Sequence, residues 1–272
     1  MIRTVITGVT GRMGSTLVRL VNASDTFELV GASDRKGAGL PLLDAALAAR
    51  LGSLATPLSD DLAKVLEGAR PHVVIDFTSA EASLVHARAC AAAGVALVVG
   101  STGFSAAQRA ELVELARRIP LVVAPNMSVG VNVVIQVAAR LAQLLGEGFD
   151  VEVLEAHHRM KKDAPSGTAL KLADALAQAL QRSPGDLRYE RNGQIGERPP
   201  REIGVQTLRG GDVVGEHTVF FYGEGERVEL THRATSRDQF AKGALRAAAW
   251  VARRPPGLYD MADVLGLKEL LP

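Results

Sequence analysis

The stretch EAHHRMKKDAPSGTAL, residues 155–170, gathers side chains that can transfer protons and bind anions. Its adjacent histidines, His157 and His158, can exchange protons near neutral pH. The small polar run 166–168, Ser-Gly-Thr, follows a proline and leads into a segment with helical periodicity. Three cations accompany these residues, and they are Arg159, Lys161 and Lys162. The composition is typical of a reactive or ligand-binding segment.

Four interpretations of this stretch are open, and the residues favour the last. A metal site is disfavoured because adjacent side chains of an extended segment point to opposite faces, so His157 and His158 do not readily share an ion. A Schiff-base lysine, or a solvated basic loop, leaves the run 166–168 unexplained. The first N–H groups of a helix from about 168 to 181, with nearby hydroxyls, can hold a carboxylate. A proton donor beside such groups suits a small dicarboxylate reduced by hydride.

Bulk composition limits the classes of function. Hydrophobic residues make up 47% and charged residues 22%, which is ordinary for a soluble globular protein. The net charge of +1 gives no global nucleic-acid footprint, so we expect no nucleic-acid partner. The one cysteine, Cys90, excludes an intrachain disulfide and a cysteine-based zinc site, and we expect it to be buried and structural. The run AAAGVALVVG is too short to cross a bilayer, so we expect a cytoplasmic protein without a membrane partner.

The first half of the chain alternates expected strands with expected helices. Short apolar runs, continuous in hydrophobicity, are typical of strands buried on both faces of a parallel sheet. Strand–helix alternation indicates right-handed crossovers and a doubly wound Rossmann-type sheet. The expected strands are 2–7, 27–33, 72–78, 95–102 and 121–126, and the expected later helices are 80–93 and 105–118.

The turn GVTGRMG after the first strand predicts a dinucleotide-binding site. Gly8, Gly11 and Gly14 allow a tight turn and a close approach of the backbone to a pyrophosphate at a helix N-terminus. Asp34, at the end of the second strand, can accept hydrogen bonds from the adenosine ribose, and Arg35 can pair with the extra phosphate of NADP. The alternatives are a turn without ligand and a surface ion pair. The Asp34–Arg35 couple favours use of both NADH and NADPH.

Two further strand ends lie where ligands of open α/β sheets bind. These are the segments 100–103, Gly-Ser-Thr-Gly, and 124–127, Ala-Pro-Asn-Met. Small residues there would let the backbone approach a nicotinamide ring. Each segment alone is equally compatible with an ordinary turn.

The second half has a different pattern. After Met127 we expect a helix over about 132–145, and then strands that alternate apolar and polar residues. Consecutive strands without intervening helices predict a second α+β domain with a mixed or antiparallel sheet. The expected strands are 150–158, 202–210, 213–223 and 227–234, followed by a helix over 238–253.

Several motifs in one order resemble the 4-hydroxy-tetrahydrodipicolinate reductase family, also called dihydrodipicolinate reductase. They are GVTGRMG, DFT at 76–78, GSTGF, APNMSVGVN, EAHHRMKKDAPSGTA, GERPPREIG and VGEHTVFF, and they span nearly the whole chain. The segment around His157 is much more specific than the glycine turn. The resemblance implies an NAD(P)H oxidoreductase acting on a CH–CH group in diaminopimelate and lysine biosynthesis, generally a homotetramer. Asp34 stands where some members have glutamate, which leaves the ratio of NADH to NADPH use open.

The resemblance also implies roles for residues at matching positions. His157 matches the acid/base and Lys161 its partner lysine, and the sequence leaves open which of them gives the proton. His158, Ser166, Gly167 and Thr168 match positions that hold the substrate carboxylates. The expected cofactor contacts are Gly8, Val9, Thr10, Gly11, Arg12, Met13, Asp34, Arg35, Gly100, Ser101, Thr102, Ala124, Pro125, Asn126 and Met127; no metal is expected.

The resemblance predicts a discontinuous cofactor domain of residues 1–127 and 237–272, and a substrate and oligomerisation domain of residues 128–236. Domain closure about hinges near 127 and 236 is expected, because water should be excluded before hydride transfer. Two other functions remain as alternatives: a non-catalytic NAD(P) sensor, and an amino-acid dehydrogenase of related two-domain build. Retention of His157, Lys161 and the run 166–168 favours catalysis.

Overall fold

The structure is a computed structural model that describes residues 1–35 and 59–270. The chain folds into two compact units. The first unit is Met1–Ser128 with Asp238–Gly266, and the second is Val129–Arg237 with Leu267–Pro272. The predicted division places residues 237–272 together with the first domain, whereas in the structure the segment that starts at Leu267 belongs to the second unit.

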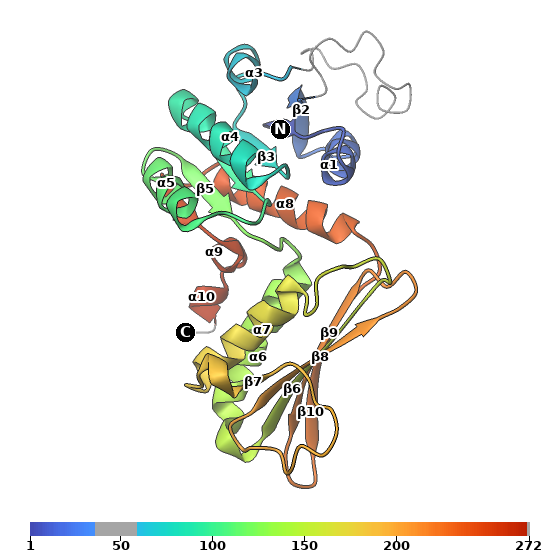
Figure 1. Ribbon diagram of the computed structural model, residues 1–272. Helices are drawn as coiled ribbons and strands as arrows, with labels where there is room; N and C mark the ends of the chain where they lie inside the picture. Colours follow the sequence, from blue (N-terminus) through green and yellow to red (C-terminus); the bar gives the residue numbers. More distant parts are fainter. Residues whose placement is uncertain (36–58, 271–272) are drawn as a thin grey trace. The chain divides into compact units, whose positions relative to one another are not determined.

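The first unit is built on a six-stranded parallel sheet with the order β11-β5-β4-β3-β1-β2 (Figure 1). Its chain order reverses at β1, which lies between β2 and β3, and such a switch point is where open α/β sheets bind ligands. The strands are β1 (Ile2–Thr7), β2 (Phe27–Ser33), β3 (Val73–Asp76), β4 (Ala96–Val99), β5 (Pro120–Val123) and β11 (Gly257–Tyr259).

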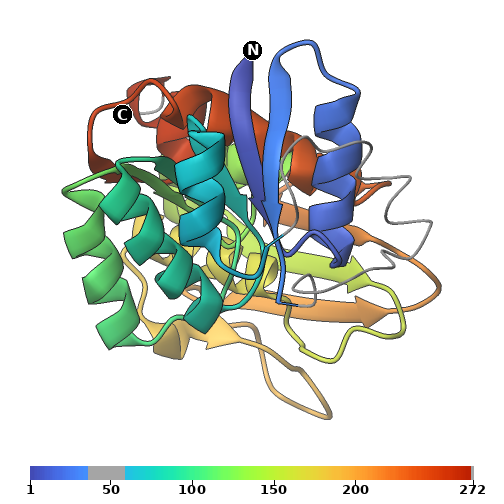
Figure 2. The ribbon, with the colours of Figure 1, turned by 90° about the horizontal axis from the view of Figure 1, so that it is seen from above.

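Helices cover both faces of this sheet, as Figure 2 shows from above. Successive strand residues pack on opposite faces: Ile75 joins the core under α1 and α8, whereas Val74 joins the core under α3, α4 and α5. Strands buried on both sides therefore need continuous hydrophobic sequence. The helices are α1 (Arg12–Asn22), α3 (Leu62–Ala69), α4 (Ala80–Ala93), α5 (Ala106–Ala116), α8 (Asp238–Val251) and α9 (Met261–Leu265).

The second unit has a five-stranded mixed sheet with the order β10-β9-β6-β8-β7. Strand β9 is antiparallel to β6 and β10, whereas β8 is parallel to β6 and β7. Helices α6 (Val129–Leu145) and α7 (Gly167–Ala179) pack on one face through a shared core. The strands are β6 (Asp150–His157), β7 (Leu187–Arg188), β8 (Ile203–Arg209), β9 (Gly215–Tyr222) and β10 (Arg227–Ala234); η1 (Gly146–Gly148), η2 (Pro184–Asp186) and α10 (Leu267–Leu270) complete the assigned elements. The predicted fold class is confirmed in both parts.

One helical segment, Val129–Gly148, is 20 residues long and apolar enough to cross a membrane by length and composition alone. A single helix of this kind is a weak indication, because core helices have the same composition. Val131, Ile135 and Ala138 of α6 are buried in the core of the second unit. The helix therefore has a packing role within its own unit.

Candidate active site

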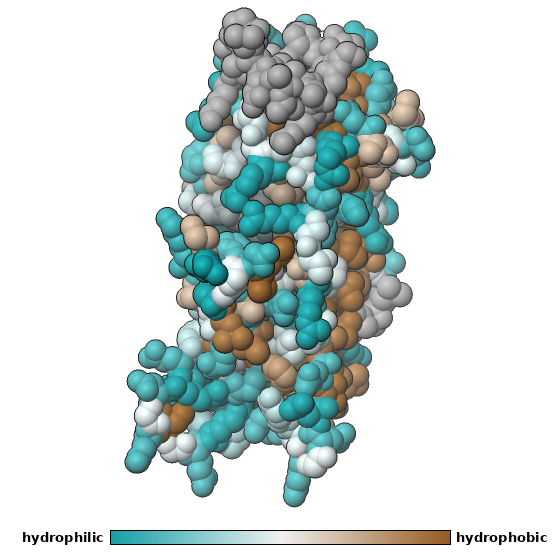
Figure 3. Space-filling model, turned by 90° about the vertical axis from the view of Figure 1, so that its right-hand side faces the viewer, coloured by the Kyte–Doolittle hydropathy of each residue, from teal (hydrophilic) through white to brown (hydrophobic). Residues whose placement is uncertain are grey.

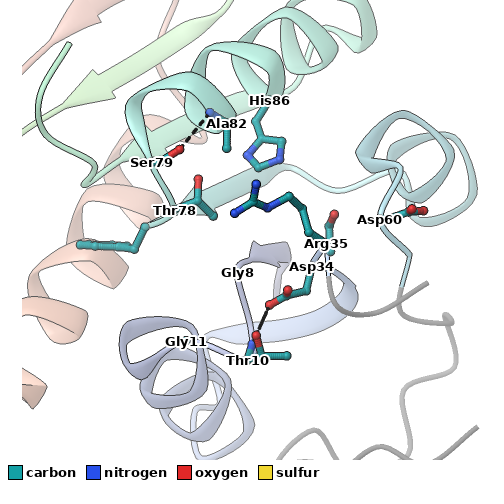
Figure 4. Close-up of a pocket in the computed structure, with 12 residues that line it drawn as sticks. Gly8, Thr10, Gly11, Asp34, Arg35, Asp60, Thr78, Ser79, Ala82 and His86 are labelled. Carbon is teal, nitrogen blue, oxygen red and sulfur yellow. Dashed lines mark hydrogen bonds between the residues drawn. The ribbon is translucent and has the colours of Figure 1, made fainter. Parts of the chain in front are cut away.

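The glycine turn of the first unit opens a pocket of about 290 Å³ at the carboxyl ends of β1, β2 and β3 (Figure 4). Gly8 has φ +64°, and a Cβ at Gly14 would lie 2.1 Å from the Gly8 carbonyl oxygen. Both positions therefore require glycine. Helix α1 begins at Arg12, and its N-cap residue, Gly11, has no side chain that could accept a hydrogen bond from the first turn. The first N–H groups of the helix can therefore bind an anion.

Asp34 and Arg35 line this pocket in different ways. The Asp34 carboxylate accepts hydrogen bonds from the Thr10 backbone N–H at 2.9 Å and the Thr10 hydroxyl at 2.6 Å. This ties the end of β2 to the glycine turn. The Arg35 side chain points toward Thr78 and His86 (Figure 4). Carboxylate and guanidinium thus lie at one pocket, as nucleotide recognition requires.

The other predicted cofactor contacts divide between core and surface. Ser101 is buried and its hydroxyl lies 2.8 Å from that of Ser83, while Gly100 packs so closely under Phe77 that a Cβ would lie 2.1 Å from the ring. The side chains of Val9, Ala124 and Met127 belong to the first core. The exposed members of the set are Arg12, Thr102 and Pro125. Met13 packs against the same core as Val9. The Asn126 side chain accepts a hydrogen bond from the Ser128 N–H. Their contacts with a cofactor stay a prediction.

In the second unit, His157 is the last residue of β6, and Ser166 is the N-cap of the following helix, α7. The His157 ring Nδ1 lies 2.5 Å from the Glu155 carboxylate, and this carboxylate is fully buried. Burial by itself would raise the pKa of Glu155. Hydrogen bonds from His157, Arg209 and the Ser166 N–H outweigh that effect and lower the pKa to about 2. Glu155 is therefore an ionised acceptor at neutral pH.

A second imidazole, His217, lies beside His157. The two rings are T-shaped, with centroids 5.2 Å apart. The Ser166 hydroxyl is 3.2 Å from His217 Nε2, and it also accepts the Ala169 N–H as the N-cap of α7. Burial, reinforced by the charge of His157, lowers the pKa of His217 to about 4. His217 is therefore uncharged at neutral pH.

The remaining predicted residues lie on the loop between β6 and α7. Lys161 forms an ion pair with Asp163, with Nζ and Oδ2 2.9 Å apart. His158 Nε2 is 3.3 Å from an Arg237 nitrogen. Gly167 is exposed with open space around its Cα, and Thr168 is half-buried at the first turn of α7. The Ser166 side chain is buried, so its predicted contact with substrate stays a prediction.

Chemically, this cluster offers a histidine held by an ionised carboxylate, a charged lysine, and the N-terminus of a 13-residue helix. Such a set can donate a proton and bind an anion. Within residues 1–35 and 59–270, no group of three or more His, Cys, Asp or Glu side chains is placed to hold a metal ion. The histidine–carboxylate pair, the lysine and the helix N-terminus favour acid–base chemistry on an anionic compound.

Family models match nearly the whole chain. The model described as dihydrodipicolinate reductase, N-terminus, matches residues 2–127, and the one described as dihydrodipicolinate reductase, C-terminus, matches residues 130–265. The chain belongs to the dihydrodipicolinate reductase family. Its predicted membership and its class, a nicotinamide-dependent oxidoreductase, are confirmed.

Relatives in the dihydrodipicolinate reductase family match end to end. A protein of Myxococcus xanthus named 4-hydroxy-tetrahydrodipicolinate reductase is 66% identical over 269 residues, with 99% of each chain covered. One of Anaeromyxobacter dehalogenans (strain 2CP-1) with the same name is 60% identical, covering 98% of this chain and 99% of its own. A solved dipicolinate-bound dihydrodipicolinate reductase from Paenisporosarcina sp. TG-14 has a TM-score of 0.75 and 26% identity, covering 97% and 98% of the two chains.

Some residues of this dihydrodipicolinate reductase site were not predicted from the sequence. In the first unit these are Asp76 and His86, paired at 2.6 Å, of which His86 lines the pocket at the glycine turn. The DFT motif holds Asp76, but a histidine later along a helix gives no signal of its own. In the second unit they are Glu155, Arg209 and His217. Glu155 stands inside the recognised motif, two residues before His157 on an expected strand, and this spacing, which puts both side chains on one face, was the available clue.

Proposed function

We propose that this chain reduces 4-hydroxy-tetrahydrodipicolinate to tetrahydrodipicolinate with NAD(P)H and loss of water, in diaminopimelate and lysine biosynthesis. The observation that carries the proposal is the Glu155–His157 pair at the start of α7, in a chain of this family. The relatives from Myxococcus and Anaeromyxobacter carry the name of this activity, and the Paenisporosarcina relative is dipicolinate-bound.

The substrate is a ring dicarboxylate, and the second unit supplies complementary groups. The first N–H groups of α7, at Gly167 and Thr168, bind one carboxylate with the helix dipole behind them. On the preceding loop, Lys161 contributes a positive charge and His158 contributes a ring that can form hydrogen bonds. These contacts orient the ring so that hydride reaches C4.

Hydride addition to C4 leaves negative charge that is delocalised onto the ring nitrogen, and one proton completes the reduction. His157 is the donor best prepared for this step, because the Glu155 carboxylate stabilises its protonated form. Lys161 stabilises the developing charge as a cation. The water lost comes from the 4-hydroxyl group before the ring is reduced.

Both NADH and NADPH serve as hydride donors in this proposal. Asp34 is hydrogen-bonded to Thr10, which holds its carboxylate on the glycine turn where the adenosine ribose is expected. Arg35 reaches across the pocket and can pair with the additional phosphate of NADPH. The pocket therefore contains a partner for each cofactor.

We propose a cytoplasmic homotetramer assembled through the second unit. The face of its sheet opposite α6 and α7 carries Leu208, 54% exposed, and Tyr222, 39% exposed. In the lower part of Figure 3, apolar side chains lie among hydrophilic ones. Partly apolar sheet faces of this kind are typical of subunit contacts. Light scattering of the purified protein measures the assembly directly.

The deciding experiment is a coupled assay with enzymatically made 4-hydroxy-tetrahydrodipicolinate, followed by the loss of reduced-nicotinamide absorbance. We expect oxidation of both NADH and NADPH, with kcat/KM values within about tenfold of each other, a difference of about 1.4 kcal/mol. Omission of the substrate is the control. No oxidation of either nucleotide would overturn the proposal, and oxidation only with an amino acid and NAD(P)⁺ in the reverse direction would favour a dehydrogenase.

A further inference from the structure

The Glu155 carboxylate is the most heavily hydrogen-bonded acceptor of the candidate site. It is fully buried on β6, and it accepts from four residues. Oε2 lies 2.5 Å from His157 Nδ1 and 2.9 Å from Arg209 Nη1. Oε1 accepts from the Ser166 N–H at 3.0 Å, from the Thr207 hydroxyl at 3.1 Å and from Arg209 Nη2 at 2.9 Å. Both oxygens are thus committed.

These bonds connect both ends of the loop that carries Lys161. His157 precedes the loop, Ser166 ends it, and each contacts Glu155. Arg209 Nη2 also donates to the Asp163 carbonyl oxygen at 2.6 Å, within the loop. One buried carboxylate therefore determines where His157, Lys161 and the start of α7 lie relative to each other.

The same contacts select one tautomer of His157. An ionised carboxylate only accepts hydrogen bonds, so the His157 Nδ1 must carry a hydrogen. This leaves Nε2 as the nitrogen that gives up or takes the reacting proton. A Cβ at Gly215 would lie 3.0 Å from this Nε2, so the glycine leaves it room. The site resembles in logic the carboxylate–histidine part of a catalytic triad.

We infer that Glu155 is the positioning residue of this site: it fixes the Nδ1–H tautomer of His157 and anchors both ends of the loop 158–165, so that His157 Nε2 faces the compound held at the start of α7. The inference rests on the proposed reductase function for the identity of that compound. Arg209 acts as a counter-ion that keeps the buried carboxylate charged. A purely structural ion pair is the competing explanation.

The variant Glu155→Gln keeps the shape of the side chain and removes its charge. We expect kcat to fall about 100-fold, because a slightly misplaced acid costs about this factor, while the KM for NADH stays within about twofold. The pH–rate profile should move to lower pH, because the protonated imidazole loses its negative neighbour. Glu155→Asp, which keeps the charge, should restore the profile though only part of kcat.

The matched control is Glu152→Gln. Glu152 lies on the same strand and forms ion pairs with Arg191 and Arg198, without a contact to His157. A merely structural role predicts equal losses of thermal stability and of kcat in the two variants, and no shift of the pH profile. Unchanged kcat and profile in a folded Glu155→Gln protein would also overturn the inference.

A second test covers the case in which Glu155→Gln does not fold. Gly215→Ala removes no polar contact but places a methyl group against His157 Nε2, and Gly148→Ala, in open space, is its control. We expect a loss of about tenfold in kcat for the first variant and none for the second. Equal activity in both would contradict the placement of Nε2.

Histidine ¹⁵N chemical shifts separate this inference from the proposed function. They report the protonated ring nitrogen of His157 without substrate or cofactor. We expect the Nδ1–H tautomer in the wild type and a mixture in Glu155→Gln. Should the wild type oxidise no NAD(P)H, this tautomer would still support the positioning role. An Nε2–H tautomer in the wild type would overturn the positioning role whether or not the enzyme is active.

Discussion

Two buried carboxylate–histidine pairs lie in different units of this chain, and their pairing geometry is nearly the same. In the first unit, Asp76 Oδ2 is 2.6 Å from His86 Nδ1, and in the second, Glu155 Oε2 is 2.5 Å from His157 Nδ1. Both carboxylates are fully buried, and the histidine side chains are 15% and 12% exposed. Geometry within the pair therefore does not distinguish their roles.

The neighbours of each pair differ. Asp76 receives its other hydrogen bonds from its own turn, through the Thr78 N–H at 2.8 Å and the Thr78 hydroxyl at 2.6 Å. Glu155 receives them from Ser166, Thr207 and Arg209, which come from separate segments of the chain. A carboxylate with local partners fixes a turn, whereas one with distant partners fixes the relative positions of several elements. We therefore propose that the first pair maintains the shape of the pocket and that the second takes part in proton transfer.

The largest expected effect comes from His157→Gln. The substitution removes the proton donor and keeps a polar side chain, so kcat should fall by about 10³-fold, within the range for general acid–base catalysis. The affinity for NADH should change little, because the nucleotide pocket is lined by residues of the first unit. Steady-state kinetics and a fluorescence titration with NADH measure the two quantities. Retained turnover would mean that Lys161, and not His157, donates the proton, and the two pairs would then no longer differ in role.

The next effect in size concerns stability at acidic pH. The pKa of His217 in the folded protein is about 4, below its ordinary 6.5, so between these values the unfolded chain binds the proton and the folded chain does not. Stability from neutral His217 is therefore complete above pH 6.5 and is lost as pH falls toward 4. At pH 5 the loss is about 2 kcal/mol. The Glu155 contribution, with a pKa of about 2 against 4.5, is lost only below pH 4.5.

Urea unfolding at pH 7.5 and pH 5 measures this difference. We expect His217→Gln to lose about 2 kcal/mol less than the wild type over that interval, whatever its stability at pH 7.5. His72→Gln, at an exposed histidine, provides the comparison and should behave as the wild type does. Equal losses of stability in the wild type and in His217→Gln would show that His217 is not buried in its neutral form.

The sequence predicted the first unit well, because strands buried on both faces have an unmistakable hydrophobic pattern. The strands 2–7 and 27–33 have the predicted bounds. The expected strand 72–78 instead ends at Asp76, because its carboxylate accepts the Thr78 N–H and turns the chain. Strand β11 was missed, since three residues after two prolines carry no periodic signal.

The candidate site was predictable only where it is contiguous in sequence. His157, Lys161 and residues 166–168 share one motif, so their association could be stated in advance. Arg209 and His217 could not be assigned, because strand register brings them to the site. The β6–β8 pairing sets His157 opposite Arg209, and the β6–β9 pairing sets Glu155 opposite His217. A single sequence does not determine the register between distant strands.

The smallest expected effect comes from His86→Gln, and it tests the assignment of the first pair. His86 lines the nucleotide pocket beside Arg35 (Figure 4), and Asp76 would lose one hydrogen bond. Since one hydrogen bond contributes about 1 kcal/mol, the KM for NADH should rise about fivefold, with kcat nearly unchanged. Arg88→Gln is the control, because exposed Arg88 lies on the same helix and pairs with Glu111 away from the pocket.

The two histidine variants are informative together. If neighbours decide the role of a carboxylate–histidine pair, His157→Gln acts on kcat and His86→Gln acts on the KM for the nucleotide. A large fall in kcat for His86→Gln, with its KM unchanged, would place a proton-transfer role in the first unit. Local hydrogen bonding from Thr78 would then be no guide to function, and the distant partners of Glu155 would lose their diagnostic value.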